Sequence, residues 1–167
     1  DILAFGAHPD DVELSAAGTL IKHVKKGFSV GIVDLTLGEM GTRGTPEIRK
    51  KEADNAMKII GAKFRDNLQL PDGFIDISKE SISKIVHKIR LYQPKIILCN
   101  ATKDRHPDHS VASKLVSKSC FISGLSKFET FEKKISQPPY RPLNIYHYIQ
   151  DQWIDPDLII DISDEYK

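Results

Sequence analysis

The sequence opens with ILAFGAHPDDVELSAAGTLIKHVKK, residues 2–26, and the expected architecture can be built outward from this segment. Residues 2–7 form an apolar run that is typical of a strand buried on both faces. In residues 12–26 apolar side chains recur at helical spacing, which predicts an amphipathic helix. The polar letters H-P-D-D separate the two patterns. The segment therefore predicts a β-α unit that carries histidine and aspartate side chains at its turn.

The same alternation of strand and helix patterns continues along the chain. A helix is expected to begin at Pro46 with Thr45 as its N-cap and to end at Gly61. Residues 126–142 contain three prolines and are expected to be irregular. Further strands are expected at residues 30–36, 64–70, 95–100, 143–149 and 158–162, and further helices at residues 78–92 and from about 110 to 123.

Strands that alternate with helices of this length predict an α/β fold with a mostly parallel sheet. We expect a Rossmann-like three-layer arrangement in which the strand order begins 3-2-1-4. Strands 1 and 4 are then neighbours at the point where the strand order reverses, and ligands bind at the carboxyl ends of the strands there. The length of 167 residues fits one domain, predicted over residues 1–167.

Two short histidine–aspartate clusters lie where this topology would bring them together. A-H-P-D-D (residues 7–11) follows the first strand, and H-P-D-H (residues 106–109) follows the fourth. We predict that His8, Asp11 and His109 hold one metal ion, because zinc favours nitrogen and oxygen ligands and a catalytic zinc site keeps one position open. Nitrogen and oxygen ligands do not select zinc by affinity alone, so Fe(II) or another divalent ion is an alternative to Zn²⁺.

The remaining polar residues of the two clusters supply acid and base groups beside the predicted metal. Asp10 is the candidate general base, because it is a carboxylate next to the ligands without being one of them. His106, in its protonated form, is the candidate donor to a tetrahedral oxyanion. Asp108 is expected to pair with the ring of His106 and to hold it protonated and oriented. These roles together predict a hydrolase that activates water.

A glycine-rich charged loop follows the second strand. Gly38, Gly41 and Gly44 suit tight turns, and the loop and the helix after it carry Glu39, Arg43 and Arg49. Loops at the carboxyl edge of a parallel sheet often bind substrate. Glu39, Arg43 and Arg49 are therefore candidate substrate-binding residues.

Composition narrows the classes of partner. The formal net charge is +1, and the basic residues are scattered, so nothing indicates binding to nucleic acid. No apolar stretch is long enough to span a membrane, and we expect neither a leader nor a membrane partner. Cys99 and Cys120 are too few for a disulfide framework and are expected to be reduced core residues, as in a cytoplasmic protein.

The two clusters, together with T-L-G-E at residues 36–39, resemble the LmbE/PIG-L superfamily of zinc-dependent N-deacetylases. More narrowly, LTLGEMGTRGTPEIR (residues 35–49), DRHPDH (residues 104–109) and YHYIQ (residues 146–150) are similar to the bacillithiol-biosynthesis branch, which removes acetate from N-acetylglucosaminyl malate. The resemblance implies a small amino-sugar conjugate as substrate. It also implies that the C-terminal part of the family domain, often at an oligomer interface, is missing here, and that the protein forms homotrimers or homohexamers.

The resemblance assigns roles that agree with the spacing argument: zinc on His8, Asp11 and His109, with Asp10 as base. It also implies that Arg105 joins Arg49 near the pocket, where guanidinium groups would bind substrate carboxylates in bidentate fashion. In one respect the chain departs from the family. Some relatives carry a tyrosine two positions before the H-P-D-H histidine, whereas this chain has Asp104, so no tyrosine donor is implied.

Several alternatives stay open at this stage. Another N-acetylglucosamine conjugate or a chitooligosaccharide could be the substrate. A non-catalytic metal-binding or sugar-binding protein could use the same ligands, although it would not need Asp10 and His106. A dinucleotide-binding module is disfavoured because the first turn lacks G-x-G-x-x-G and carries carboxylates where a pyrophosphate would bind. A two-metal phosphatase normally needs more ligands than these clusters offer.

Overall fold

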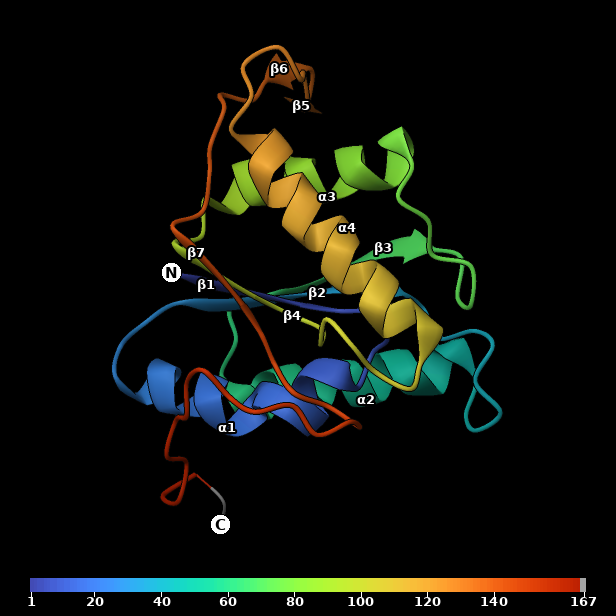
Figure 1. Ribbon diagram of the computed structural model, residues 1–167, viewed down its shortest axis with the longest axis vertical. Coiled ribbons are helices and arrows are strands. Elements are labelled where there is room, and N and C mark those ends of the chain that lie inside the picture. The colour runs from blue at the N-terminus through green and yellow to red at the C-terminus, as the bar shows by residue number, and fades with distance from the viewer. Residues whose placement is uncertain (166–167) are drawn as a thin grey trace.

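The computed structural model describes residues 1–165, so the last two residues of the predicted domain lie outside the described residues. Figure 1 shows a central sheet with helices on both faces. Within the described residues the main sheet has the order β3-β2-β1-β4-β7, and every neighbouring pair is parallel. The predicted order 3-2-1-4 is confirmed, and a fifth strand extends the sheet beside β4. The strands are β1 (Ile2–Gly6), β2 (Val30–Thr36), β3 (Arg65–Leu70), β4 (Ile96–Cys99) and β7 (Asn144–His147).

Two pairs of helices cover the sheet and make three layers. The helices α1 (Asp11–Lys25) and α2 (Pro46–Ile60) pack on one face, and α3 (Lys79–Tyr92) and α4 (Pro107–Ser123) on the other (Figure 1). Successive side chains of β1 point to opposite faces of the sheet, so this one strand contributes to the core on each side. Leu3 and Phe5 belong to the core under α3 and α4, whereas Ile2 and Ala4 belong to the core over α1 and α2.

Helix ends follow the predicted capping residues where local chemistry is strong. The Thr45 side chain accepts a hydrogen bond from the backbone N–H of Ile48 at 3.3 Å, and α2 begins at Pro46. Gly61 ends the same helix in the left-handed conformation, with φ of 78°, which glycine adopts without steric cost. Cys99 and Cys120 are free and buried, as expected.

The predicted start of α4 was wrong by three residues. The helix begins at Pro107 instead of near residue 110, so Asp108 and His109 lie in its first turn and His106 is the N-cap. Proline suits this position because its missing N–H has no helical partner there and its φ is already helical.

Two other predictions toward the C-terminus differ in their outcome. Residues 126–142 are mostly irregular, as expected, but they contain a short antiparallel hairpin of β5 (Phe131–Glu132) and β6 (Ile135–Ser136). Residues 158–162 were expected to form a strand, yet they join no ladder among the described residues. Ile162 instead packs closely against Gly18 of α1. An apolar segment forms a β-strand only where it can pair with a neighbouring strand, whereas this segment contacts the helix α1.

Among the described residues, no helix combines the length and the apolar character that crossing a bilayer would require.

Candidate metal and catalytic site

The first cluster forms a tight turn between β1 and α1. The carbonyl of His8 accepts hydrogen bonds from the backbone N–H groups of Asp10 and Asp11, and the His8 N–H donates to Asp11 Oδ2 at 3.0 Å. Gly6 permits this turn, because a Cβ there would lie 3.0 Å from the His8 carbonyl oxygen. Asp10 is the N-cap residue of α1, but its side chain makes no capping hydrogen bond.

The second cluster is held by the first turn of α4. The backbone N–H of Asp108 donates to His106 Nδ1 at 3.3 Å, so the His106 ring caps the helix. Asp104 Oδ1 lies 3.0 Å from His109 Nδ1 and also accepts from the backbone N–H of His106. The loop before α4 thus orients both histidines.

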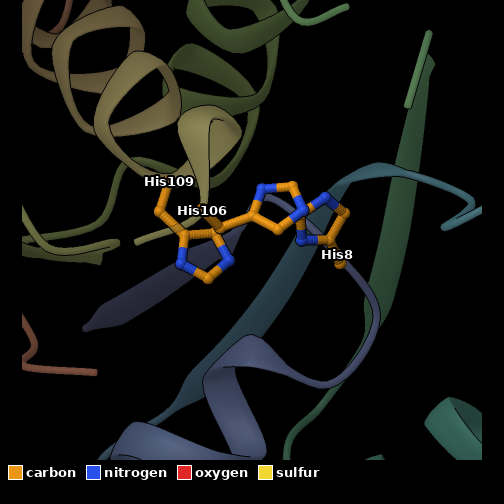
Figure 2. A group of neighbouring side chains, drawn as sticks. All are labelled: His8, His106 and His109. Carbon is orange, nitrogen blue, oxygen red and sulfur yellow. The ribbon is translucent and has the colours of Figure 1, made fainter. Parts of the chain in front are cut away.

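Topology brings the two clusters together at the carboxyl edge of the sheet. Asp11 Oδ1 lies 3.1 Å from His109 Nε2, and Asp11 Oδ2 lies 3.5 Å from His8 Nδ1. Figure 2 shows the rings of His8, His106 and His109 gathered between the starts of α1 and α4. The ring centroid of His106 is 4.6 Å from that of His8 and 4.9 Å from that of His109.

Two amide side chains hold the Asp11 carboxylate in place. Asn100, directly after β4, donates from Nδ2 to Asp11 Oδ2 at 2.9 Å, and Gln150, after β7, donates from Nε2 to Asp11 Oδ1 at 3.0 Å. Asn100 Nδ2 also donates to Gln150 Oε1 at 3.0 Å, and Asn100 Oδ1 accepts from the N–H of Ala7. No sequence pattern predicted these roles for Asn100 and Gln150, although Gln150 ends the Y-H-Y-I-Q motif.

The protonation of the predicted ligands reflects their mutual contacts. Burial raises the pKa of Asp11, but hydrogen bonds with His109 and His8 outweigh it and hold that pKa well below its usual range. Burial lowers the pKa of His8, yet its contact with Asp11 and the charges of Asp72 and Asp108 raise it to about 9. Binding of a metal ion would therefore release a proton from His8.

The donor set fits a divalent metal ion. The three predicted ligands offer two imidazole nitrogens and a carboxylate, which suit Zn²⁺ and other first-row divalent ions. Among the described residues, two groups have ligand atoms within 4.8 Å of one another: His8 with His106 and His109, and His8 with Asp72 and Asp108. His8 belongs to both groups, whereas Asp11 belongs to neither, so the predicted set of His8, Asp11 and His109 stays a prediction.

The Asp108 carboxylate makes contacts that differ from the expected pair with the His106 ring. Its Oδ2 lies 3.4 Å from His8 Nε2 and accepts from the backbone N–H of Gly73 at 2.8 Å. The charge of Asp108 still opposes a fall in the pKa of His106. Burial and the positive charges of His8 and His109 nevertheless lower that pKa, which favours a neutral His106 ring instead of the expected protonated one.

Asp10 lies beside the ligands and is open to solvent. Its Oδ2 is 3.4 Å from Arg49 Nη2, and the pKa of Asp10 is raised by burial and by the charge of Asp11. The guanidinium of Arg49 packs against Gly38 and Gly41, where a Cβ would meet it at 2.6 and 2.5 Å. The glycines therefore let Arg49 reach under the loop to Asp10.

The other candidate substrate residues lie farther out. Glu39 is exposed and its Oε1 accepts from the backbone N–H of Asp72 at 2.9 Å. Arg43 is exposed on the same loop. Arg105 donates from Nε to Asp151 at 3.0 Å, and its side chain is 75% exposed. The structure thus brings Arg49 to the site and leaves Arg43 and Arg105 on the surface around it.

Comparison with known proteins places these features in a family. The chain matches the PIG-L family model, described as GlcNAc-PI de-N-acetylase, over residues 3–120. It is 38% identical over 120 residues to the uncharacterized deacetylase YaiS of Escherichia coli, covering 65% of this chain and 61% of that protein. It is 25% identical over 174 residues to 4-oxalmesaconate hydratase of Pseudomonas putida, covering 96% of this chain and 67% of that protein.

A solved structure supports the same relationship. The crystal structure of the conserved protein TT1542 from Thermus thermophilus matches with a TM-score of 0.91 and 37% identity, covering 98% of this chain and 72% of that chain. The chain spans about three fifths to two thirds of the length of the curated relatives described above. The family match includes both histidine–aspartate clusters, and the chain therefore belongs to the LmbE/PIG-L family.

Proposed function

We propose that this protein is a divalent-metal-dependent hydrolase that removes the N-acetyl group from an N-acetylglucosamine conjugate and releases acetate. The observation that carries the proposal is the contact of Asp11 with both His8 and His109, with Asp10 and His106 beside them. A non-catalytic metal protein would have no need for a second carboxylate and a third imidazole at that place. Membership of a family described by a de-N-acetylase supports the reaction class.

His8, Asp11 and His109 would hold the metal ion. When bound, a zinc or other divalent ion supplies Lewis-acid polarisation and lowers the pKa of a coordinated water. Asn100 and Gln150 keep the Asp11 carboxylate in one orientation, so the protein contributes a preformed ligand instead of a mobile one.

Asp10 is the proposed general base. Its carboxylate is not engaged in capping α1, and it is half exposed, so it can reach both a water molecule and a departing amine. Burial and the charge of Asp11 raise the pKa of Asp10 above the usual carboxyl value, which favours uptake of a proton by this carboxylate. Arg49, 3.4 Å away, keeps enough positive charge nearby for Asp10 to start as a carboxylate.

His106 is the proposed donor to the developing oxyanion. Its Nδ1 accepts a hydrogen bond from the Asp108 backbone, so the proton of the neutral ring lies on Nε2. A neutral imidazole agrees with the lowered pKa of His106 and can still donate one hydrogen bond to a negative oxygen. The side chain of Asp108 contacts His8 instead, so the carboxylate would act on His106 only through its charge.

The finer substrate proposal is N-acetylglucosaminyl malate, the substrate of the bacillithiol branch that the motifs resemble. Arg49 at the site and Arg105 at its rim could bind the two malate carboxylates. Another N-acetylglucosamine conjugate or a chitooligosaccharide would use the same reaction chemistry without needing both arginines. Substitution of Arg105 by methionine should raise KM for the malate conjugate and leave KM for N-acetylglucosamine unchanged.

The test is acetate release by the zinc-loaded protein from N-acetylglucosamine, its malate conjugate and diacetylchitobiose. Asp10→Asn should retain bound metal and lose at least about 100-fold in kcat, because it loses a general base. The matched control is Asp54→Asn on α2, at a partly exposed side chain that pairs with Lys50, and it should leave kcat unchanged. Unchanged turnover in Asp10→Asn would remove Asp10 from the mechanism.

A rival reaction is hydration of an unsaturated acid, which is the activity named for the Pseudomonas putida relative. The same assay should therefore include 4-oxalmesaconate. Hydration of that compound, with no acetate released from any amino sugar, would overturn the proposed deacetylation.

A further inference from the structure

Asp72 is a buried carboxylate outside both histidine–aspartate clusters. It lies in the turn after β3 and is only 7% exposed. Its Oδ1 is 3.1 Å from His8 Nε2, and its Oδ2 accepts from the backbone N–H of Met40 at 2.8 Å. One side chain thus contacts both the predicted metal ligand His8 and the glycine-rich loop that leads to Arg49.

The turn that carries Asp72 also donates two backbone hydrogen bonds to carboxylate side chains. The backbone N–H of Asp72 donates to Glu39 Oε1 at 2.9 Å, so Glu39 and Asp72 bind each other's segments reciprocally. The next backbone N–H, of Gly73, donates to Asp108 Oδ2 at 2.8 Å. Both carboxylates that face His8 Nε2 are therefore held by one short turn.

These contacts assign different tasks to the two ring nitrogens of His8. Nδ1 faces Asp11, whereas Nε2 faces Asp72 at 3.1 Å and Asp108 at 3.4 Å. Ionised carboxylates only accept hydrogen bonds, so the proton of a neutral His8 belongs on Nε2. The lone pair of Nδ1 is then free for a metal ion shared with Asp11. A carboxylate behind a metal-ligating histidine commonly fixes its tautomer and ring orientation in this way.

We propose that Asp72 is a positioning residue that couples the orientation of His8 to the position of the glycine-rich loop. Through Oδ1 it sets the His8 tautomer, and through Oδ2 it anchors the backbone of Met40. The affinity for the metal ion and the binding of substrate then both depend on the buried carboxylate of Asp72. The second half of this inference rests on the proposed function, because it concerns a substrate that the loop contacts.

Two substitutions separate the two contacts. In Asp72→Asn the amide oxygen can still accept from Met40, but the amide nitrogen then opposes the N–H of His8. With Asp108 Oδ2, 3.4 Å from Nε2, as the remaining acceptor, this repulsion either turns the His8 ring or moves its proton to Nδ1, and both changes weaken the metal site. Asp72→Ala loses both contacts. The matched control is Asp54→Asn, an identical change at a partly exposed position on α2.

The first measurement is zinc affinity, by competition with a chromophoric chelator, on metal-free proteins whose thermal unfolding has shown them to be folded. Asp72→Asn should bind zinc about 10- to 100-fold more weakly than the parent protein, and Asp54→Asn should match the parent. The second measurement is the split between KM and kcat for the best N-acetylated substrate. Asp72→Ala should raise KM several-fold above that of Asp72→Asn, since only the alanine variant releases the loop.

The outcomes separate this inference from the proposed function. Zinc affinity within twofold of the parent in folded Asp72→Asn overturns the role of Asp72, whatever the activity. If the parent protein releases no acetate, the proposed function fails while the affinity measurement still decides the metal part. If Asp72→Ala does not fold, the isosteric Asp72→Asn alone gives the decision. Equal KM in both variants would overturn the link to the loop.

Discussion

Replacing Asn100 by aspartate tests the arrangement around the central ligand Asp11. Asn100 is fully buried, and its Nδ2 donates to Asp11 Oδ2 at 2.9 Å and to Gln150 Oε1 at 3.0 Å. Asn100→Asp keeps the shape of the side chain and its contact with the N–H of Ala7. The substitution replaces the Nδ2 donor of Asn100 by a carboxylate oxygen, which then faces two other acceptors, Asp11 Oδ2 and Gln150 Oε1.

The magnitude follows from the distance. Two unit charges about 4 Å apart repel by about 4 kcal/mol at an effective dielectric constant of about 20. The variant avoids part of this cost by binding a proton, because 4 kcal/mol corresponds to about 3 pKa units. We therefore expect metal-free Asn100→Asp to lose about 4 kcal/mol of unfolding free energy at pH 8. We expect a smaller loss near pH 5, where a proton shared between the two carboxyl groups removes the repulsion.

The assay is urea denaturation of the metal-free proteins at several pH values, followed by repetition with zinc. A bound cation offsets the added negative charge, so zinc should raise the stability of Asn100→Asp more than that of the parent. Asn144→Asp, at an exposed position of β7, is the matched control and should change stability by less than about 0.5 kcal/mol. A loss below about 1 kcal/mol at pH 8, or a loss that does not depend on pH, would refute the reasoning.

Three other changes test the fold. Burial raises the pKa of Asp66, but hydrogen bonds from Lys88 and Tyr92 outweigh burial and leave the folded-state pKa below its usual value. The Asp66 carboxylate therefore stabilises the protein fully above its unfolded-state pKa near 4. This stabilisation is lost as the pH falls through the lower folded-state pKa. Asp66→Asn should therefore cost about 1 kcal/mol at pH 7, and urea titrations should show the difference vanishing below about pH 3; a constant difference would contradict this account. Leu115→Ala, in the core between α4 and the sheet, should cost about 2–5 kcal/mol, and a loss under 1 kcal/mol in chemical denaturation would argue against that packing. Thr45→Ala should cost about 1 kcal/mol, while Thr45→Ser should restore most of it if the hydroxyl caps α2.

The β-α alternation and the strand order were predictable because local patterns encode them. The apolar run before His8 and the helical spacing after it require no knowledge of distant residues. Four such units constrain the topology through the handedness of the crossovers. The meeting of the two clusters then follows from the adjacency of β1 and β4, which the structure confirms.

The contacts that support the site could not be predicted from local patterns. Asn100 and Gln150 are 89 and 139 residues from Asp11 along the chain, and Asp72 reaches His8 from a turn with no periodic signal. Their residue types are common at turns and strand ends, where most serve only local hydrogen bonds. The run at residues 158–162 misled for the opposite reason: its apolar letters fit a strand, but strand formation depends on a pairing partner that sequence alone does not supply.

The most direct test of the account is an X-ray crystal structure of the zinc-loaded protein with anomalous data collected at the zinc absorption edge. The account predicts one anomalous peak within about 2.3 Å of His8 Nδ1, an oxygen of Asp11 and His109 Nε2, with Asp10 and His106 not coordinated. A peak between His8 Nε2, Asp72 and Asp108, or a peak coordinated by His106 together with His8 and His109, would contradict this prediction.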